Sequence, residues 1–187
     1  MSKTEPPHPL HLVLERISSI FRAEGRDKAG VYGLKLVQLE ALIYFSVANR
    51  YSDTAGALAE YLGITKGTAS QSVLALERRN LIEKEPDAKD GRVLHCKVTA
   101  EGRQILEDSN KASFLSNLSE AQSETAHRAA LQLMRTLQAG VAFQMFGQCK
   151  SCTYFQNAGA AHRCGLTGEA LSKGDSMLIC REHKSAA

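Results

Sequence analysis

The spacing of apolar residues changes near residue 80, and this change restricts the fold more than any other feature of the sequence. Up to that point apolar residues recur three and four positions apart, the spacing of amphipathic helices. Beyond it, residues 81–85 and 93–98 are two short strand candidates. Turn-forming residues fill positions 86–92 between them. The sequence therefore predicts a mainly α-helical fold with one small β-hairpin.

Six helices are expected, four before the hairpin and two after it. Gly25 and Gly30 should break the chain between the first two. The fifth helix carries apolar residues as far as Leu118, and a capping box of Ser119 and Gln122 starts the sixth. The expected ranges are 10–21, 34–48, 54–62, 66–79, 99–118 and 119–146.

The third and fourth helices and the hairpin follow one another in the order of a winged helix-turn-helix. Gly63 suits the left-handed end of the third helix, and Thr65 is a typical N-cap for the fourth. The fourth helix would enter the major groove of DNA, while the hairpin tip would reach phosphates or the minor groove. The candidate DNA-binding residues are Lys66, Thr68, Ser70 and Gln71 on the helix and Lys89 and Arg92 on the tip. The alternative is that these side chains are only the solvated face of a helix and a turn.

Residues 36–106 resemble the MarR family of regulators. The resemblance is carried by VQLEALIYF and by LAEYLGITKGTASQSVLALERRNLIEKEPDAKDGRVLHCKVTAEGR, which together include both helices and the wing. It implies a homodimer built from the first, fifth and sixth helices, which presents two recognition helices to double-stranded DNA. It also implies that Thr68, Ser70, Gln71 and Arg92 face the DNA. Asn80 stands where the family usually has glycine, and Lys89 where it often has arginine.

Four of the five cysteines lie in the last quarter of the chain, which divides it into a winged-helix part (residues 1–148) and a cysteine-rich tail (149–187). Cys149 and Cys152 form a Cys-x-x-Cys motif, Cys164 follows after eleven residues, and Cys180 after fifteen more. In a reducing cytosol such a cluster favours a metal site over disulfides, and would staple a tail too small to hold a core. The alternative is a set of small buried thiols without a metal.

Two metal centres fit the four cysteines. Zinc is favoured, and His183 would replace Cys164 as a ligand if Cys180-x-x-His183 acts as a second knuckle. The alternative is an iron–sulfur cluster, because the two long gaps and the aromatic Tyr154 and Phe155 resemble the loops of high-potential iron–sulfur proteins. That resemblance is partial, since Ile179 stands beside the last cysteine where an aromatic residue is usual.

Other functions are less well supported by the sequence. It has no glycine-rich phosphate loop, nucleophile elbow or His-Glu metalloprotease motif, so no enzyme activity is expected. It has no apolar run of the roughly 18 residues needed to span a bilayer, so a cytoplasmic protein without a membrane partner is expected. A transcriptional regulator is the leading interpretation, with no effector identified. The alternative is a redox or electron-transfer accessory protein whose winged helix binds another protein.

Overall fold

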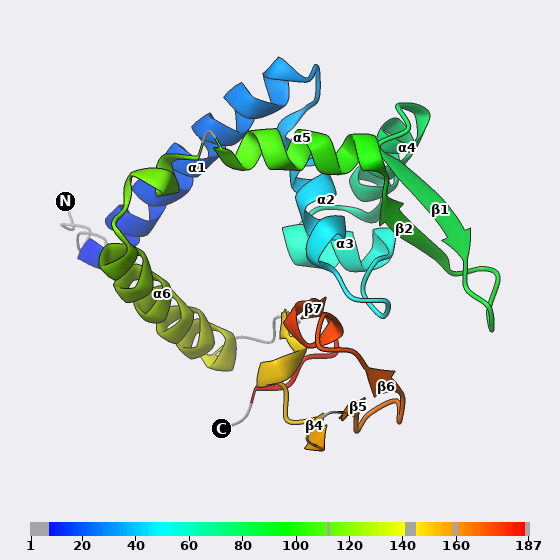
Figure 1. Cartoon of the computed structure of the whole chain (residues 1–187). Helices are drawn as coiled ribbons and strands as arrows, with labels where there is room; N and C mark the ends of the chain where they lie inside the picture. The colour runs from blue at the N-terminus through cyan, green and yellow to red at the C-terminus, as the bar shows by residue number, and fades with distance from the viewer. Residues whose placement is uncertain (1–7, 112, 141–144, 159–160, 186–187) are drawn as a thin grey trace, which may run out of the picture.

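The structure is a computed structural model that describes residues 8–111, 113–140, 145–158 and 161–185. Its first part is mainly helical with a two-stranded wing, as predicted (Figure 1). The elements of this part are α1 (Pro9–Val31), α2 (Leu36–Val47), α3 (Ala55–Leu62), α4 (Lys66–Arg78), β1 (Ile82–Pro86), β2 (Leu94–Val98), α5 (Ala100–Lys111), the 3-10 turn η1 (Phe114–Asn117) and α6 (Glu120–Gly140).

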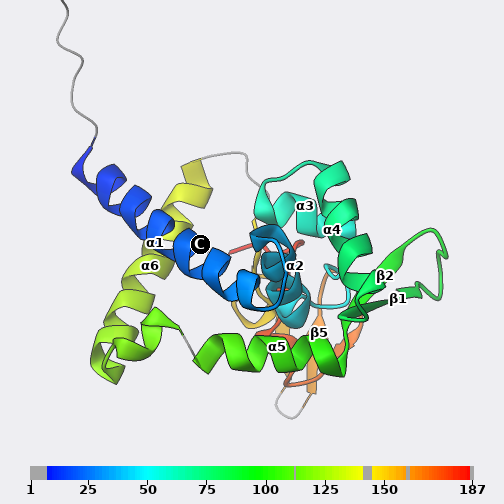
Figure 2. The same cartoon turned by 90° about the horizontal axis from the view of Figure 1, so that it is seen from above.

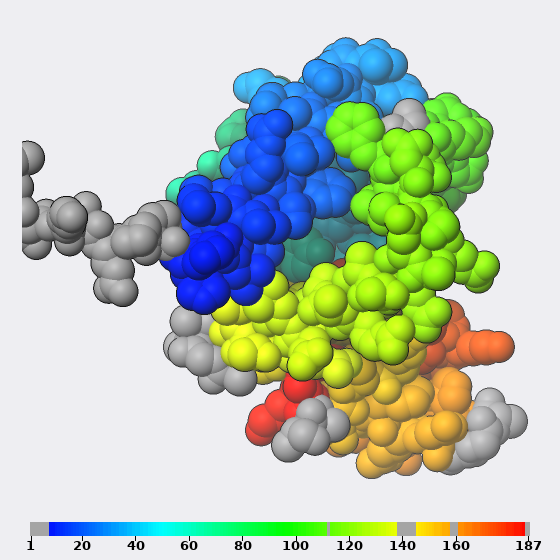
Figure 3. Space-filling model, turned by 90° about the vertical axis from the view of Figure 1, so that its left-hand side faces the viewer, coloured from blue at the N-terminus to red at the C-terminus, as the bar shows by residue number. Residues whose placement is uncertain are grey.

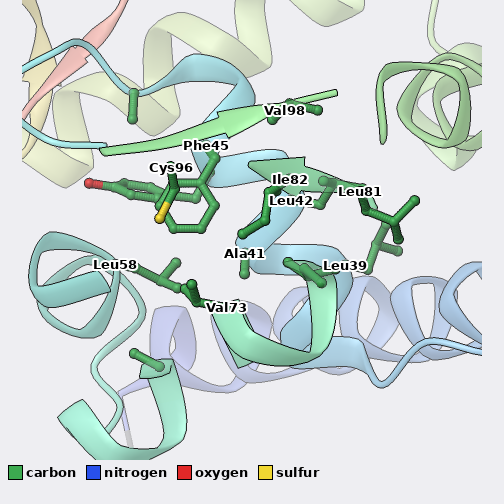
Figure 4. Packing of buried hydrophobic residues seen from close by; sticks show 14 of the residues in the cluster. Leu39, Ala41, Leu42, Phe45, Leu58, Val73, Leu81, Ile82, Cys96 and Val98 are labelled. Atoms are coloured by element: carbon green, nitrogen blue, oxygen red, sulfur yellow. The ribbon is translucent and has the colours of Figure 1, made fainter. Parts of the chain in front are cut away.

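The hydrophobic core lies where α2, α3 and α4 meet the base of the wing (Figure 4). Leu42 and Phe45 of α2 are buried in this core, together with Cys96 of β2. The inward face predicted for the fourth helix is confirmed, because Ala69, Val73 and Leu76 are all buried.

Local signals at the ends of the helices are confirmed. The Thr65 hydroxyl accepts a hydrogen bond from the Thr68 amide (3.1 Å), and Gly63 is left-handed with φ 64°. Asn80 is also left-handed, with φ 57°, so the asparagine fills the role that glycine usually has. Thr99 caps α5 by accepting from the Gly102 amide at 3.1 Å.

The predicted break at Gly25 and Gly30 is wrong, because both glycines lie inside α1. A Cβ atom on Gly25 would come within 2.6 Å of Leu36 Cδ1. Gly25 therefore allows α1 and α2 to approach closely, and the chain turns only after Val31, where Gly33 is left-handed with φ 62°.

The prediction of a long fifth helix is also wrong, because α5 ends at Lys111 and Leu115 lies in the separate turn η1. The capping box at the start of α6 is present, since Ser119 and Gln122 exchange hydrogen bonds of 2.9 and 3.3 Å. Within the described residues α6 ends at Gly140. Residues 141–144, which the prediction placed in this helix, lie outside the described residues.

Helices α1, α5 and α6 extend away from the core as an open frame (Figures 1 and 2). Figure 3 shows α1 and α6 on one face of the molecule. Large apolar side chains of α1 are exposed in the single chain, among them Leu12 at 52% and Val13 at 54%.

The last part of the chain is a small unit (residues 146–185) that we call the cysteine unit. It contains two small antiparallel sheets, in the orders β3–β7 and β4–β5–β6. Phe146 begins the unit and packs edge-on against Tyr61 of α3, with ring centroids 5.2 Å apart. The elements are β3 (Gly147–Gln148), η2 (Cys149–Ser151), β4 (Phe155–Ala158), β5 (Ala161–Cys164), β6 (Ala170–Leu171), η3 (Asp175–Met177) and β7 (Ile179–Cys180).

Of the helices that the structure describes, no single one is long and apolar enough to cross a membrane. Helices α1 and α2 meet those criteria only together, as a pair bent by 94°.

The contact between α5 and the wing gives a test of the fold. A Cβ atom on Gly102 would overlap the Leu81 carbonyl oxygen and approach Val98 Cγ1 to 2.8 Å. We therefore expect Gly102→Ala to lower the free energy of unfolding by about 1–3 kcal/mol in urea titrations. Gly56→Ala in α3 is the control, because the nearest atom to its Cβ is 4.0 Å away and alanine favours the helix. Equal stability of the two variants would contradict this packing.

Candidate nucleic-acid interface and cysteine-lined cavity

Helix α4 presents a polar face opposite its buried one. All four residues predicted to contact DNA on this helix are exposed: Lys66, Thr68, Ser70 and Gln71. The Thr68 hydroxyl also lies 2.9 Å from the Thr65 hydroxyl, so it contributes to the helix cap. At the other end of the helix, Arg79 donates to the Tyr32 and Gly33 carbonyl oxygens and holds α4 against the α1–α2 turn.

The tip of the wing is folded around Asp87. Its carboxylate accepts the amides of Lys89 and Asp90, both at 2.8 Å, and these bonds together with His95 lower the pKa of Asp87 to about 2. Lys89 and Arg92 project from this turn with 85% and 90% of their side chains exposed. Both predicted cations therefore lie on an ordered turn that faces solvent.

Each of these cations already has a carboxylate partner. Arg92 makes two bonds of 2.9 Å to the Asp90 side chain. Lys89 lies 3.4 Å from Glu169 of the cysteine unit, which Tyr51 also contacts at 2.7 Å. Exposed ion pairs of this kind contribute little stability and exchange readily for phosphate.

Residues 49–53, between α2 and α3, connect the wing to the cysteine unit, and sequence reasoning did not identify them. Asp53 is only 2% exposed and binds two wing side chains, His95 Nδ1 and Lys97 Nζ, each at 2.5 Å. The Asp53 carbonyl accepts the Cys96 amide at 2.7 Å. We call residues 49–53 the connecting loop.

The other side of the connecting loop holds the cysteine unit. The Asn49 amide donates to the Ile179 carbonyl (2.9 Å), and the Arg181 amide donates to Ser52 Oγ (2.9 Å). Both Asn49 and Ser52 are buried. No local sequence pattern signals these bonds, because their partners lie more than a hundred positions away.

The four clustered cysteines line one cavity of about 400 Å³, between the cysteine unit, the connecting loop and the wing. Cys149 and Cys180 lie at the β3–β7 pair, Cys152 follows η2, and Cys164 ends β5. All four are free thiols in the structure. The residues that the spacing in the sequence grouped together thus line the same cavity.

Polar hydrogens point at the sulfur atoms. Asn49 Nδ2 donates to Cys149 Sγ at 3.6 Å, and the Lys184 amide to Cys152 Sγ at 3.4 Å. The proximity of Cys149 and Cys180 lowers the pKa of the Cys180 thiol and, together with burial, raises that of Cys149. N–H donors to sulfur favour the thiolate, the form of cysteine that binds metals.

His183 lies apart from the cavity wall. Its ring packs on Gly147, and its Nε2 atom lies 3.0 Å from Ser151 Oγ. Cys164 lines the cavity, whereas His183 does not. Among the described residues, no group of three or more His, Cys, Asp or Glu is arranged to hold a single metal ion.

Cys96 is separate from this cluster, as its position in the sequence suggested. It is 1% exposed in the core, and burial raises the pKa of its thiol to about 12.

A model of the MarR family matches residues 32–93, about a third of the chain, which include the helix-turn-helix and most of the wing. None of the curated proteins matches the chain.

Solved structures share the fold of the winged-helix part. The regulator BldR of Sulfolobus solfataricus is 20% identical, with a TM-score of 0.56 over 75% of this chain and 100% of that one. MarR of E. coli is 16% identical, with a TM-score of 0.54 over 71% and 99%. MepR of S. aureus, in a complex with DNA, is 23% identical with a TM-score of 0.52 over 67% and 94%. At these sequence identities the similarity shows a shared fold and nothing further.

The contact between His95 and the connecting loop predicts a dependence on pH. The hydrogen bond to Asp53 and a second one to Asp87 raise the pKa of His95 above 6.5. Protonated His95 therefore stabilises the fold fully below about pH 6.5, and this stabilisation is lost as the pH rises through the higher value of the folded protein. The difference in free energy of unfolding between wild type and His95→Gln should shrink as the pH rises above about 6.5. A constant difference would show that His95 does not titrate against these carboxylates.

Proposed function

We propose that this protein is a sequence-specific DNA-binding transcriptional regulator that acts as a homodimer. The observation that carries the proposal is the exposed polar face of α4 beside an ordered wing tip with two exposed cations, Lys89 and Arg92. A helix in the major groove and a basic hairpin along the backbone are a known way to read duplex DNA. The match to the MarR family and the fold shared with MepR, which has been solved in complex with DNA, support this assignment.

The exposed apolar surface supports a dimer. Large apolar side chains on α1, η1 and α6 remain exposed to solvent in the single chain, and apolar side chains left exposed in this number are typical of a subunit interface. These residues are Leu10, Leu12, Val13, Leu14, Ile17, Ile20, Phe21, Phe114, Leu115, Met134 and Leu137. A cytoplasmic location and the absence of enzyme activity remain predictions.

The first test separates base contacts from phosphate contacts. Gln71→Ala should weaken binding to a site selected from random duplexes by about 1–3 kcal/mol and leave non-specific binding nearly unchanged. Arg92→Ala should weaken both alike and reduce the log–log salt slope by about 0.9, the value for one phosphate contact. Fluorescence anisotropy over a range of salt concentrations measures both.

Lys173→Ala, an exposed cation on the cysteine unit, is the matched control and should change neither quantity. Failure to select any DNA site would reject the proposed function and favour a protein-binding accessory.

We further propose that Cys149, Cys152, Cys164 and Cys180 ligate a metal centre. The shared cavity and the N–H donors to sulfur support it, and both zinc and an iron–sulfur cluster use thiolate ligands. The sequence alone favoured zinc.

Replacing each of these cysteines by serine should abolish metal binding, because serine is a hard and poorly ionised ligand. His183→Ala should retain the metal, since His183 lies apart from the cavity wall. Cys96→Ala is the control for loss of a thiol elsewhere. Elemental analysis gives the metal content, and full retention in all four cysteine variants would reject the site. Loss in His183→Ala together with retention in Cys164→Ser would establish the three-cysteine, one-histidine zinc site instead.

A further inference from the structure

We infer that the cysteine-lined cavity holds an iron–sulfur cluster, and that the bound cluster fixes the wing through the connecting loop so that DNA binding depends on it. The inference rests on the proposed DNA-binding function. It adds the identity of the metal centre and a physical connection between that centre and the DNA-binding surface.

The size of the cavity favours a cluster over a single ion. A zinc ion lies about 2.3 Å from each sulfur, so the sulfurs around it are only about 4 Å apart. The cavity measures about 400 Å³, whereas roughly 10–15 Å³ measured in the same way holds one water molecule. A cluster suits a wide space better than a single ion does, because it places iron and sulfide atoms between the four cysteine sulfurs.

The walls of the cavity suit the same ligand. Tyr154, Phe155, Leu166 and Leu171 give it apolar sides. The donors to sulfur described above come from Asn49 and from the Lys184 amide. Apolar walls and N–H···S bonds are the means by which proteins stabilise iron–sulfur clusters and set their potentials.

One side of the connecting loop is tied to the residues around the cavity. The Asn49 side chain donates to the proposed ligand Cys149. The Asn49 backbone amide donates to the carbonyl of Ile179, the residue before Cys180. Ser52 Oγ accepts from the Arg181 amide, on the other side of Cys180. The loop is thus bonded to Cys149 itself and to both neighbours of Cys180.

The opposite side of the loop is tied to the wing. Within the loop, Ser52 Oγ donates to the Asn49 side chain at 2.8 Å, and Asp53 follows directly. Asp53 binds His95 and Lys97 of β2, while His95 Nε2 reaches Asp87 at the tip (3.1 Å). The Asp53 amide also donates to the Asn49 carbonyl at 3.1 Å, so a series of hydrogen bonds runs from Cys149 through Asn49, Asp53 and His95 to the turn of the wing tip.

The cluster controls this series because the cysteine unit has few other means of staying folded. Among the described residues of the unit, the buried apolar ones are Phe146 and Leu171 besides Cys149 and Cys180. Without the cluster the unit loses order and releases Asn49 and Ser52. The wing must then be ordered when DNA binds, and this conformational entropy is subtracted from the binding free energy.

The experiment starts from the full chain purified without oxygen. Iron and acid-labile sulfide should be present in about equal amounts, with zinc absent. Binding to the selected DNA site is then compared between wild type and Cys164→Ser, because Cys164 has no bond to the connecting loop among those described. The serine variant should lack iron and bind the site at least about tenfold more weakly, a difference of about 1.4 kcal/mol.

A second pair of variants tests the route. Asp53→Asn should keep its iron, yet bind DNA about as weakly as Cys164→Ser. The double variant should lose no further affinity, which is the behaviour of two changes on one path. Ser52→Ala makes the same test with a smaller change, in case the buried carboxylate is needed for folding. Circular dichroism confirms that each variant is folded, and Cys96→Ala should resemble wild type in iron and affinity.

The outcomes separate the two proposals. Zinc in place of iron, or equal DNA affinity with and without the cluster, overturns this inference and leaves the DNA-binding function standing. If the double variant loses as much DNA-binding free energy as the two single variants together, the proposed connection through Asp53 is overturned. Absence of specific DNA binding in the iron-loaded wild type rejects the proposed function itself.

Discussion

The buried carboxylate of Asp53 is the contact on which the arrangement of the wing depends. A charge that is 2% exposed is costly unless it is paired, and Asp53 is paired with His95 and Lys97 of the same strand. Removing either partner would leave part of that charge uncompensated, so the strand is held in one register against the loop. The β-hairpin is consequently a fixed part of the domain at its base, although its tip is exposed.

Asn49 extends this constraint to the last part of the chain. Its side-chain oxygen accepts from the Tyr51 amide and Ser52 hydroxyl, its amide and side-chain nitrogens donate to Ile179 and Cys149, and the residue is 2% exposed. Both nitrogen donors of Asn49 would lose their partners if the cysteine unit moved away. The position of the unit and the shape of the loop are therefore set together.

The sequence predicted those features that depend on neighbouring residues. The caps at Thr65 and Thr99 and the left-handed Asn80 involve contacts within a few positions, and the cysteine spacing indicated a common site. Gly25 was misread because its role is a contact with Leu36 of the next helix, which composition does not reveal. The bonds of Asn49 and Asp53 were missed for the same reason, since their partners are 42 to 130 positions away in the chain.

A metal centre built into this network has a thermodynamic consequence. If ordering of the cysteine unit by its ligand strengthens DNA binding, linkage requires DNA to strengthen retention of that ligand by the same factor. DNA-bound protein would then release its metal more slowly to a chelator than free protein does, provided that the metal leaves through opening of the unit. A metal that serves only as a local staple, without the bonds through Asn49 and Asp53, would be released at the same rate in both states. The reciprocal effect thus distinguishes a centre that takes part in regulation from one that merely holds the tail together.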